Sequence, residues 1–106
     1  MSQFCKGYIS TNAGFEPKLK KAGDKDVYEV HVSFKDDSGY VNTTVSVWGK
    51  AIDPVATTVE KVLAKDGLQI VFEGEYIDPF VTKAGKTVEQ FRAFDASPWL
   101  TSYPRR

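Results

Sequence analysis

The sequence of 106 residues is poor in reactive side chains, with one cysteine and one histidine. The single cysteine, Cys5, excludes a disulfide within the chain and a thiolate metal cluster, and the single histidine, His31, excludes a site of several histidines. A lone cysteine is typical of a reducing compartment. No run approaches the roughly 18 apolar residues of a membrane span, and the first seven residues are not a signal peptide. We therefore expect a cytoplasmic protein, or one of the host cytoplasm or nucleoid if a phage encodes it, without metal, cofactor or membrane contact.

The sequence also lacks an excess of either charge, because 14 basic and 14 acidic side chains cancel. Bulk charge therefore does not indicate a nucleic-acid partner, and any such footprint depends on where the basic residues lie. Hydrophobic residues make up 42% and charged residues 26%, which is typical of one ordinary folded domain. The aromatic fraction of 13% is more than a small core needs to bury.

Apolar and polar residues alternate along two neighbouring segments. One face of each is apolar: Tyr28, Val30, Val32 and Phe34 in residues 27–35, and Val41, Thr43, Val45 and Val47 in residues 40–49. Period two predicts half-buried strands, and the turn formers of residues 36–39 join them into a hairpin. Three further strands are predicted over residues 3–11, 68–77 and 88–94, and residues 15–21 continue the first of them after a bend.

The period changes after residue 50. Asp53 as N-cap and Pro54 in the first turn predict a helix that ends before Gly67. Its apolar stripe consists of Val55, Val59, Val62 and Leu63. Five strands, with a helix between the third and fourth, are the element order of an OB-fold, an all-β barrel. We predict this domain over residues 1–95 and a short tail over residues 96–106, where the strand pattern ends.

Trp48 is the most informative residue of the sequence. By strand parity it lies opposite the valines, on a polar face with Tyr40 at the other end. A ring on a polar face either binds a ligand, or lies where the strand bulges, or is covered by loops or by a partner subunit. Bases stack on exposed rings, and basic side chains neutralise phosphates. The basic residues assigned to this role, which otherwise form an ordinary solvated surface, are Lys6, Lys18, Lys20, Lys21, Lys35, Lys50, Lys83, Lys86 and Arg92.

Two stretches carry a family resemblance. Residues 45–50 read V-S-V-W-G-K, and residues 65–74 read K-D-G-L-Q-I-V-F-E-G after the predicted helix. They resemble the V-x-V-aromatic-G-K stretch and the K-G-x-x-V-x-V-x-G strand of the bacterial and phage single-stranded DNA-binding proteins. Residues 7–9 and 15–19 are similar to that family's first strand, so that the resemblance covers residues 4–94.

The resemblance implies an OB-fold that binds single-stranded DNA in replication, recombination or repair, without catalysis. It also implies a homo-oligomer, a dimer or a tetramer, and replication proteins as further partners. By position, Trp48, Phe34 and Phe80 are the stacking aromatics, although parity equally allows Phe34 a place in the core. The sequence departs from the family at Glu75, where a basic residue is common. Residues 96–106 also lack the acidic, phenylalanine-ended tip with which the bacterial members recruit replication partners, so the protein is either a phage-type or accessory version or lacks this partner function.

Two other classes of function stay open. The same barrel would serve as a replication-accessory (primosome-type) or assembly module that mainly binds protein, with Trp48 in a subunit interface. Catalysis would need Cys5 and His31 to meet as nucleophile and base with no third group, so we expect no enzyme. Salt dependence separates DNA binding from protein binding, because binding to DNA weakens steeply with salt.

Overall fold

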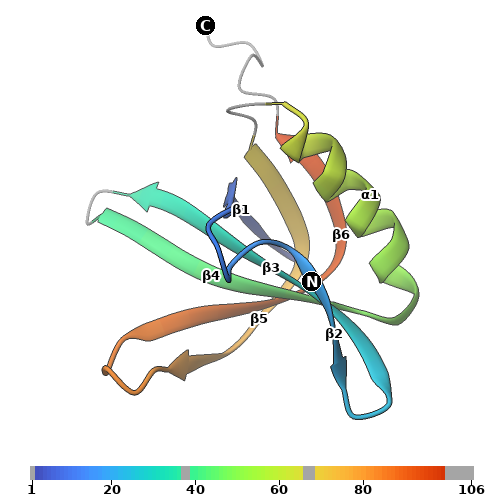
Figure 1. The fold of residues 1–106 in the computed structure, drawn as a ribbon. Coiled ribbons are helices and arrows are strands. Elements are labelled where there is room, and N and C mark those ends of the chain that lie inside the picture. Colours follow the sequence, from blue (N-terminus) through green and yellow to red (C-terminus); the bar gives the residue numbers. More distant parts are fainter. Residues whose placement is uncertain (1, 37–38, 66–68, 100–106) are drawn as a thin grey trace, which may run out of the picture.

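The computed structural model describes residues 2–36, 39–65 and 69–99. Within them the chain forms six strands, a 3₁₀ turn and one helix (Figure 1), which are β1 (Gln3–Ile9), β2 (Lys18–Ala22), β3 (Lys25–Asp36), β4 (Gly39–Trp48), η1 (Gly49–Ala51), α1 (Ile52–Leu63), β5 (Gln69–Val81) and β6 (Thr87–Trp99). None of the described residues form a helix long and apolar enough to cross a membrane.

The strands form a single sheet that closes on itself. Their order is β1-β5-β6-β4-β3-β2, and β1 also pairs with β3, so that β1, β5, β6, β4 and β3 complete a ring. The pairing of β4 with β6 is parallel, and the other pairings are antiparallel. Closure removes the exposed edges among these five strands, whereas β2 pairs only with β3 among the described strands. The predicted mostly-β, barrel-like fold is thus confirmed, but with six strands instead of five, because residues 18–22 form a strand of their own.

The core lies inside the ring and under the helix. The inward side chains follow the alternation of the sequence, and the largest fully buried ones are Val30, Val45, Val47, Ile70, Phe72 and Phe91. Three valines of α1, Val55, Val59 and Val62, are buried against them, and the helix packs chiefly beside β6 (Figure 1). Burying each valine stabilises the fold by roughly 1.5–3 kcal/mol, which holds the helix in this place.

The helix begins earlier than predicted, and Asp53 is not its N-cap. Ala51 is the N-cap residue, without a side-chain hydrogen bond, because the turn η1 leads directly from β4 into α1. Asp53 instead lies in the first turn, where its negative charge interacts favourably with the helix dipole. The helix ends at Leu63, which is exposed and so lies outside the buried stripe. Gly67, the predicted end signal, lies outside the described residues.

The last two strands are longer than predicted. β5 continues through Asp78 and Pro79 with a register shift between Ile77 and Phe80, since an irregularity accommodates a proline that cannot donate a ladder hydrogen bond. β6 does not end at Phe94 but runs to Trp99, where it pairs with the beginning of β5. Residues 96–99 of the predicted tail therefore belong to the sheet, and residues 100–106 lie outside the described part of the chain.

Candidate nucleic-acid interface

The outward sides of β3, β4 and β6 form one continuous polar surface. The register aligns His31 with Thr44 and Gln90 across the three strands, and in the next outward row Glu29 with Ser46 and Arg92. The alternate, inward positions of the same strands hold the core, so these side chains point away from it. We call this surface the three-strand face; its side chains are Glu29, His31, Ser33, Asn42, Thr44, Ser46, Trp48, Gln90 and Arg92.

A groove of about 640 Å³ lies at the His31 end of the three-strand face. Its polar lining comes from His31, Ser33, Asn42 and Thr44 of β3 and β4, from Ser10, Thr11 and Asn12 after β1, and from Thr82 after β5. Phe15, from the segment after β1, and Phe80, from the β5–β6 hairpin, also line it and are 53% and 57% exposed. Exposed rings beside hydrogen-bonding groups without a net charge suit a flat polar ligand such as a nucleobase.

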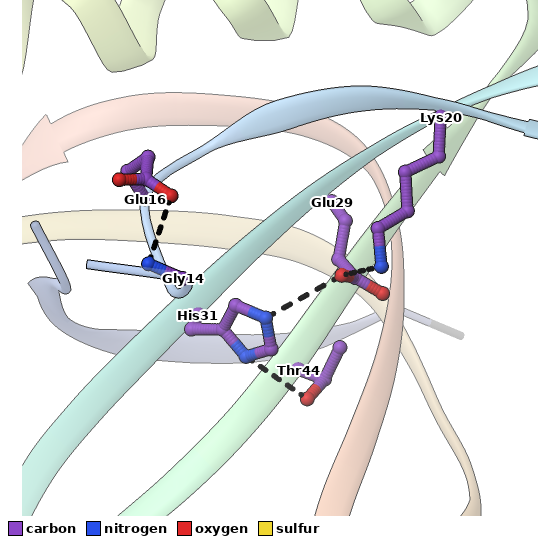
Figure 2. A network of polar contacts seen from close by, with 6 residues as sticks. All are labelled: Gly14, Glu16, Lys20, Glu29, His31 and Thr44. Atoms are coloured by element: carbon purple, nitrogen blue, oxygen red, sulfur yellow. Dashed lines mark hydrogen bonds and ion pairs between the residues drawn. The ribbon is translucent and has the colours of Figure 1, made fainter. Parts of the chain in front are cut away.

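His31 lines the groove, and Figure 2 shows its contacts with Thr44 and with Glu29 in the middle of the three-strand face. Its Nδ1 lies 3.3 Å from Oγ1 of Thr44, and its Nε2 lies 3.4 Å from Oε1 of Glu29. The ring of Phe15 meets the imidazole edge-on, with 5.3 Å between the ring centroids. The imidazole is therefore held from both sides while it lines the groove.

Glu29 also binds the ammonium of Lys20 through the same oxygen. Its Oε1 accepts from Nζ of Lys20 at 2.7 Å (Figure 2). Burial by itself would raise the pKa of Glu29, but the hydrogen bond and charge of Lys20, with a smaller effect of His31, lower this pKa below its usual value. Glu29 therefore carries a negative charge at neutral pH in the middle of the three-strand face.

Trp48 lies at the other end of the three-strand face, with its side chain outward as parity predicts. The guanidinium of Arg92 stands 5.6 Å from the ring centroid, a cation–π arrangement. The indole Nε1 is buried and has no hydrogen-bond partner among the described residues. Hollows of about 390 and 500 Å³ adjoin the ring, the first lined in part by Phe94 and the second by Lys25. The ring is thus half-buried and partly covered by Arg92, not freely exposed.

The other predicted aromatics lie in different places. Phe80 lines the groove, whereas Phe34 lies outside it, 40% exposed, with Nζ of Lys6 at 5.7 Å from its ring centroid. Phe34 is not a core residue despite its inward parity, because β1 pairs with β3 only up to Ser33, beside it. Lys35 and Tyr40 belong to β3 and β4, but their side chains are not among those that the structure describes.

The predicted basic residues are spread over several elements, and of those that the structure describes Arg92 alone belongs to the three-strand face as defined above. Lys20 and Lys21 of β2 are paired with acids, Lys21 with Asp26 at 2.8 Å. The remaining described ones lie on several elements: Lys6 on β1, Lys18 on β2, Lys50 in η1, Lys83 and Lys86 in the loop between β5 and β6, and Arg92, a member of the three-strand face, on β6. The structure therefore brings Trp48, Phe80, Lys20 and Arg92 to one surface and sets Phe34 and Lys6 apart.

Three residues of this surface were missed by sequence reasoning. Phe15 was assigned only to a continued strand, although an aromatic between Gly14 and Pro17 is a sign of an exposed loop ring. From the sequence, His31 is considered only as a metal ligand or a catalytic base, and Glu29 is given no role. Their meeting with Lys20 depends on the pairing of β2 with β3, which no local pattern shows.

A scan of the chain against protein-family models finds no match, and a search of curated proteins finds none either. Among the described residues, no three of the histidine, cysteine, aspartate and glutamate side chains gather as a metal site requires.

Proposed function

We propose that the protein binds single-stranded nucleic acid without sequence preference and without catalysis. Its sequence resemblance favours DNA as this nucleic acid. The observation that carries this proposal is the groove of about 640 Å³, in which Phe15 and Phe80 lie beside a polar lining on the outside of a closed sheet. Stacking on such rings contributes roughly 1–3 kcal/mol per base and is tolerant of sequence.

We further propose that the ring is an OB-type barrel. Both β1 and β2 pair with β3, so that they are the two halves of one bent first strand. The five strands counted in this way have the order 1-2-3-5-4-1, with the third and fifth parallel and the helix before the fourth. In OB-folds the face of the second and third strands, with the loops beside it, binds oligonucleotides. The groove lies on that face, beside the hairpin of β5 and β6.

Phosphate neutralisation supplies the second part of the mechanism. Lys83 and Lys86 lie in the loop of the hairpin that lines the groove, while Lys50 and Arg92 lie near the Trp48 end. Each phosphate that they neutralise releases bound counterions, which makes the affinity depend on salt. A chain with no net charge therefore binds through local clusters, and its affinity falls as salt rises.

The test measures the fluorescence anisotropy of a labelled oligo-dT at several salt concentrations. We expect Phe15→Ala and Phe80→Ala each to weaken binding about 5- to 150-fold, the effect of one lost stacking contact. Val81→Ala is the matched control, because Val81 is exposed on the neighbouring position of β5 but does not line the groove. Equal losses in all three variants, or no binding by the unmodified protein at low salt, would refute the proposal.

A second candidate function, an assembly module that binds protein, is favoured by a different observation. Phe4 and Tyr8 of β1 are 63% and 46% exposed and do not line the groove. We propose that these two exposed rings serve a homo-oligomer, as the sequence resemblance implies. If instead the whole function is protein binding, the partner will remain bound at high salt and oligo-dT will not compete.

A further inference from the structure

The three-strand face carries an acid at its centre, where a surface for nucleic acid needs cations. Glu29 pairs in register with Lys18 of β2 and with Ser46 of β4, between the groove at His31 and the ring of Trp48. From His31 to Val27, the partner of Trp48, β3 advances four residues, about 13 Å at the usual rise. A nucleic-acid strand that joins the groove to Trp48 therefore passes over this carboxylate.

The carboxylate of Glu29 contacts two groups, the ammonium of Lys20 and the imidazole of His31, of kinds that bind phosphates in other settings. A single oxygen, Oε1, lies 2.7 Å from the ammonium of Lys20 and 3.4 Å from the imidazole of His31 (Figure 2). An anionic oxygen between an ammonium and an imidazole has the surroundings of a bound phosphate oxygen. The side chain of Lys20 is 46% exposed and that of Glu29 only 23%, so the ammonium can be reached from solvent while the carboxylate stays in place.

On the basis of the proposed function, we propose that Glu29 holds the place of a nucleic-acid phosphate. In the free protein its carboxylate neutralises Lys20 and contacts His31. On binding, a phosphate takes over Lys20, and the carboxylate opposes it by repulsion and by competition for the same ammonium. Glu29 thus lowers the affinity for single-stranded nucleic acid and keeps binding reversible.

The same hairpin offers a matched control. Asp26 pairs with Lys21 at 2.8 Å, so that Asp26→Asn and Glu29→Gln remove the same charge and each free one lysine of β2. Strand parity places Asp26 on the opposite side of β3 from Glu29. A mere effect of net charge would be equal in both variants, whereas competition for a phosphate site is specific to Glu29.

The experiment titrates labelled oligo-dT with the unmodified protein, Glu29→Gln and Asp26→Asn over a series of salt concentrations. We expect Glu29→Gln to bind about three- to tenfold more tightly, with a salt slope steeper by up to about 0.7, the value for one further phosphate contact on a single strand. Asp26→Asn should stay within about twofold of the unmodified protein. In addition, Lys20→Gln should weaken binding more in the Glu29→Gln background than alone, because only there is the ammonium free of its acid.

The outcomes separate this inference from the proposed function. Equal affinities of Glu29→Gln and Asp26→Asn, or weaker binding by a Glu29→Gln protein whose thermal unfolding is unchanged, would overturn the role of Glu29 alone. Absence of binding in every protein, at low salt, would refute the proposed function and this inference with it.

Discussion

Trp48 makes two contacts that bear on its proposed role as a stacking ring. Its strand position pairs with Val27 in the sheet, while Arg92 stands over its ring on the outside. A ring held by a guanidinium on one side still presents an edge and the hollows beside it to a base. The indole Nε1 makes no hydrogen bond within the described residues, so an aromatic ring without that group fits the same place.

From this we expect Trp48→Phe and Trp48→Ala to behave differently. The alanine variant loses the stacking ring and should bind oligo-dT about 5- to 150-fold more weakly, whereas the phenylalanine variant keeps a ring and should lose much less. Anisotropy titration measures both, with thermal unfolding as the check that each variant is folded. Normal binding by Trp48→Ala would show that the ring has no part in the interface.

The lowered pKa of Glu29 predicts a pH dependence of stability. Burial opposes ionisation, but Lys20 and His31 outweigh it, so the pKa of the folded state lies below that of the unfolded chain. Such a group stabilises the fold above its unfolded pKa of roughly 4.3, and this stabilisation disappears as the pH falls through the folded pKa. The effect should be modest, about 0.2–1 kcal/mol, because the ion pair lies near the surface.

Urea unfolding of the unmodified protein and Glu29→Gln measures it. The unmodified protein should be the more stable of the two at pH 7, and the difference in the free energy of unfolding should shrink as the pH falls from about 5 towards 3. A difference that stays constant over this range would mean that Glu29 stabilises the fold by packing and not by its charge.

Individual site residues could be predicted from the sequence only where one strand decides their direction. Parity placed Trp48 on the outward side of β4, and the same argument failed for Phe34, which lies beyond the point where β1 pairs with β3. The meeting of Lys20 with Glu29 could not be predicted, because it requires the register of two strands. Strand direction is local information, whereas contact between strands is not.

At the scale of elements, the joining of β5 to β6 depends on Gly74. A Cβ at this position would overlap the carbonyl oxygen of Arg92 in the neighbouring strand, at the register shift between Glu73 and Gly74. We expect Gly74→Ala to lower the free energy of unfolding by about 3 kcal/mol or more, since backbone on both strands must move. It should also weaken oligo-dT binding, because Arg92 would shift away from Trp48.

Gly85, in the loop between the same strands, supplies the comparison. It has a positive φ of 84° but open space around its Cβ position, so Gly85→Ala should destabilise by only about 1–2 kcal/mol. Urea unfolding measures both variants. A Gly74→Ala protein as stable as Gly85→Ala would show that the two strands can separate at little energetic cost.

The end of β6 gives a second test at this scale. Ala96 is half-buried against the core and pairs with Phe72, and Ser97 and Pro98 continue the pairing along β5. A chain cut after residue 95 loses these contacts, whereas one cut after residue 99 keeps them. We expect the shorter chain to be less stable by about 1–3 kcal/mol in urea unfolding, from lost backbone hydrogen bonds and an uncovered core. Equal stability would restore the domain boundary that the sequence predicted.

A strand or helix could be predicted from the sequence where its own pattern of apolar and polar residues determines it. The alternation in β3 and β4 and the valine stripe of α1 were visible because each buries one face. The continuation of β5 past Pro79 and of β6 past Phe94 was not, because these segments are extended by pairing with each other and not by their own periodicity. The turn η1 likewise moved the helix start to Ile52, before the apparent cap.

At the scale of the whole molecule, closure of the sheet leaves one strand at an edge. β2 pairs only with β3 among the described strands, and it carries Lys18, Lys20 and Lys21. Lysines on an edge strand disfavour pairing with another chain. Contact between copies of the protein is therefore expected through side chains on a face, and not through strand addition at β2.

The exposed rings of β1 are the surface that we expect to form this contact. Phe4 and Tyr8 point outward from the same strand, away from the buried Cys5 and Gly7. Light scattering at micromolar concentration should give a multiple of the 11.8 kDa chain mass, and a mass near 11.8 kDa would refute a homo-oligomer. Replacement of both Phe4 and Tyr8 by serine should yield a folded monomer, because apolar burial drives the contact, whereas Val81→Ser should leave the oligomer intact.

The mass of the unmodified protein should also persist at salt concentrations that abolish oligo-dT binding, since apolar contact does not release counterions. Dissociation by salt would instead place charged side chains in the interface.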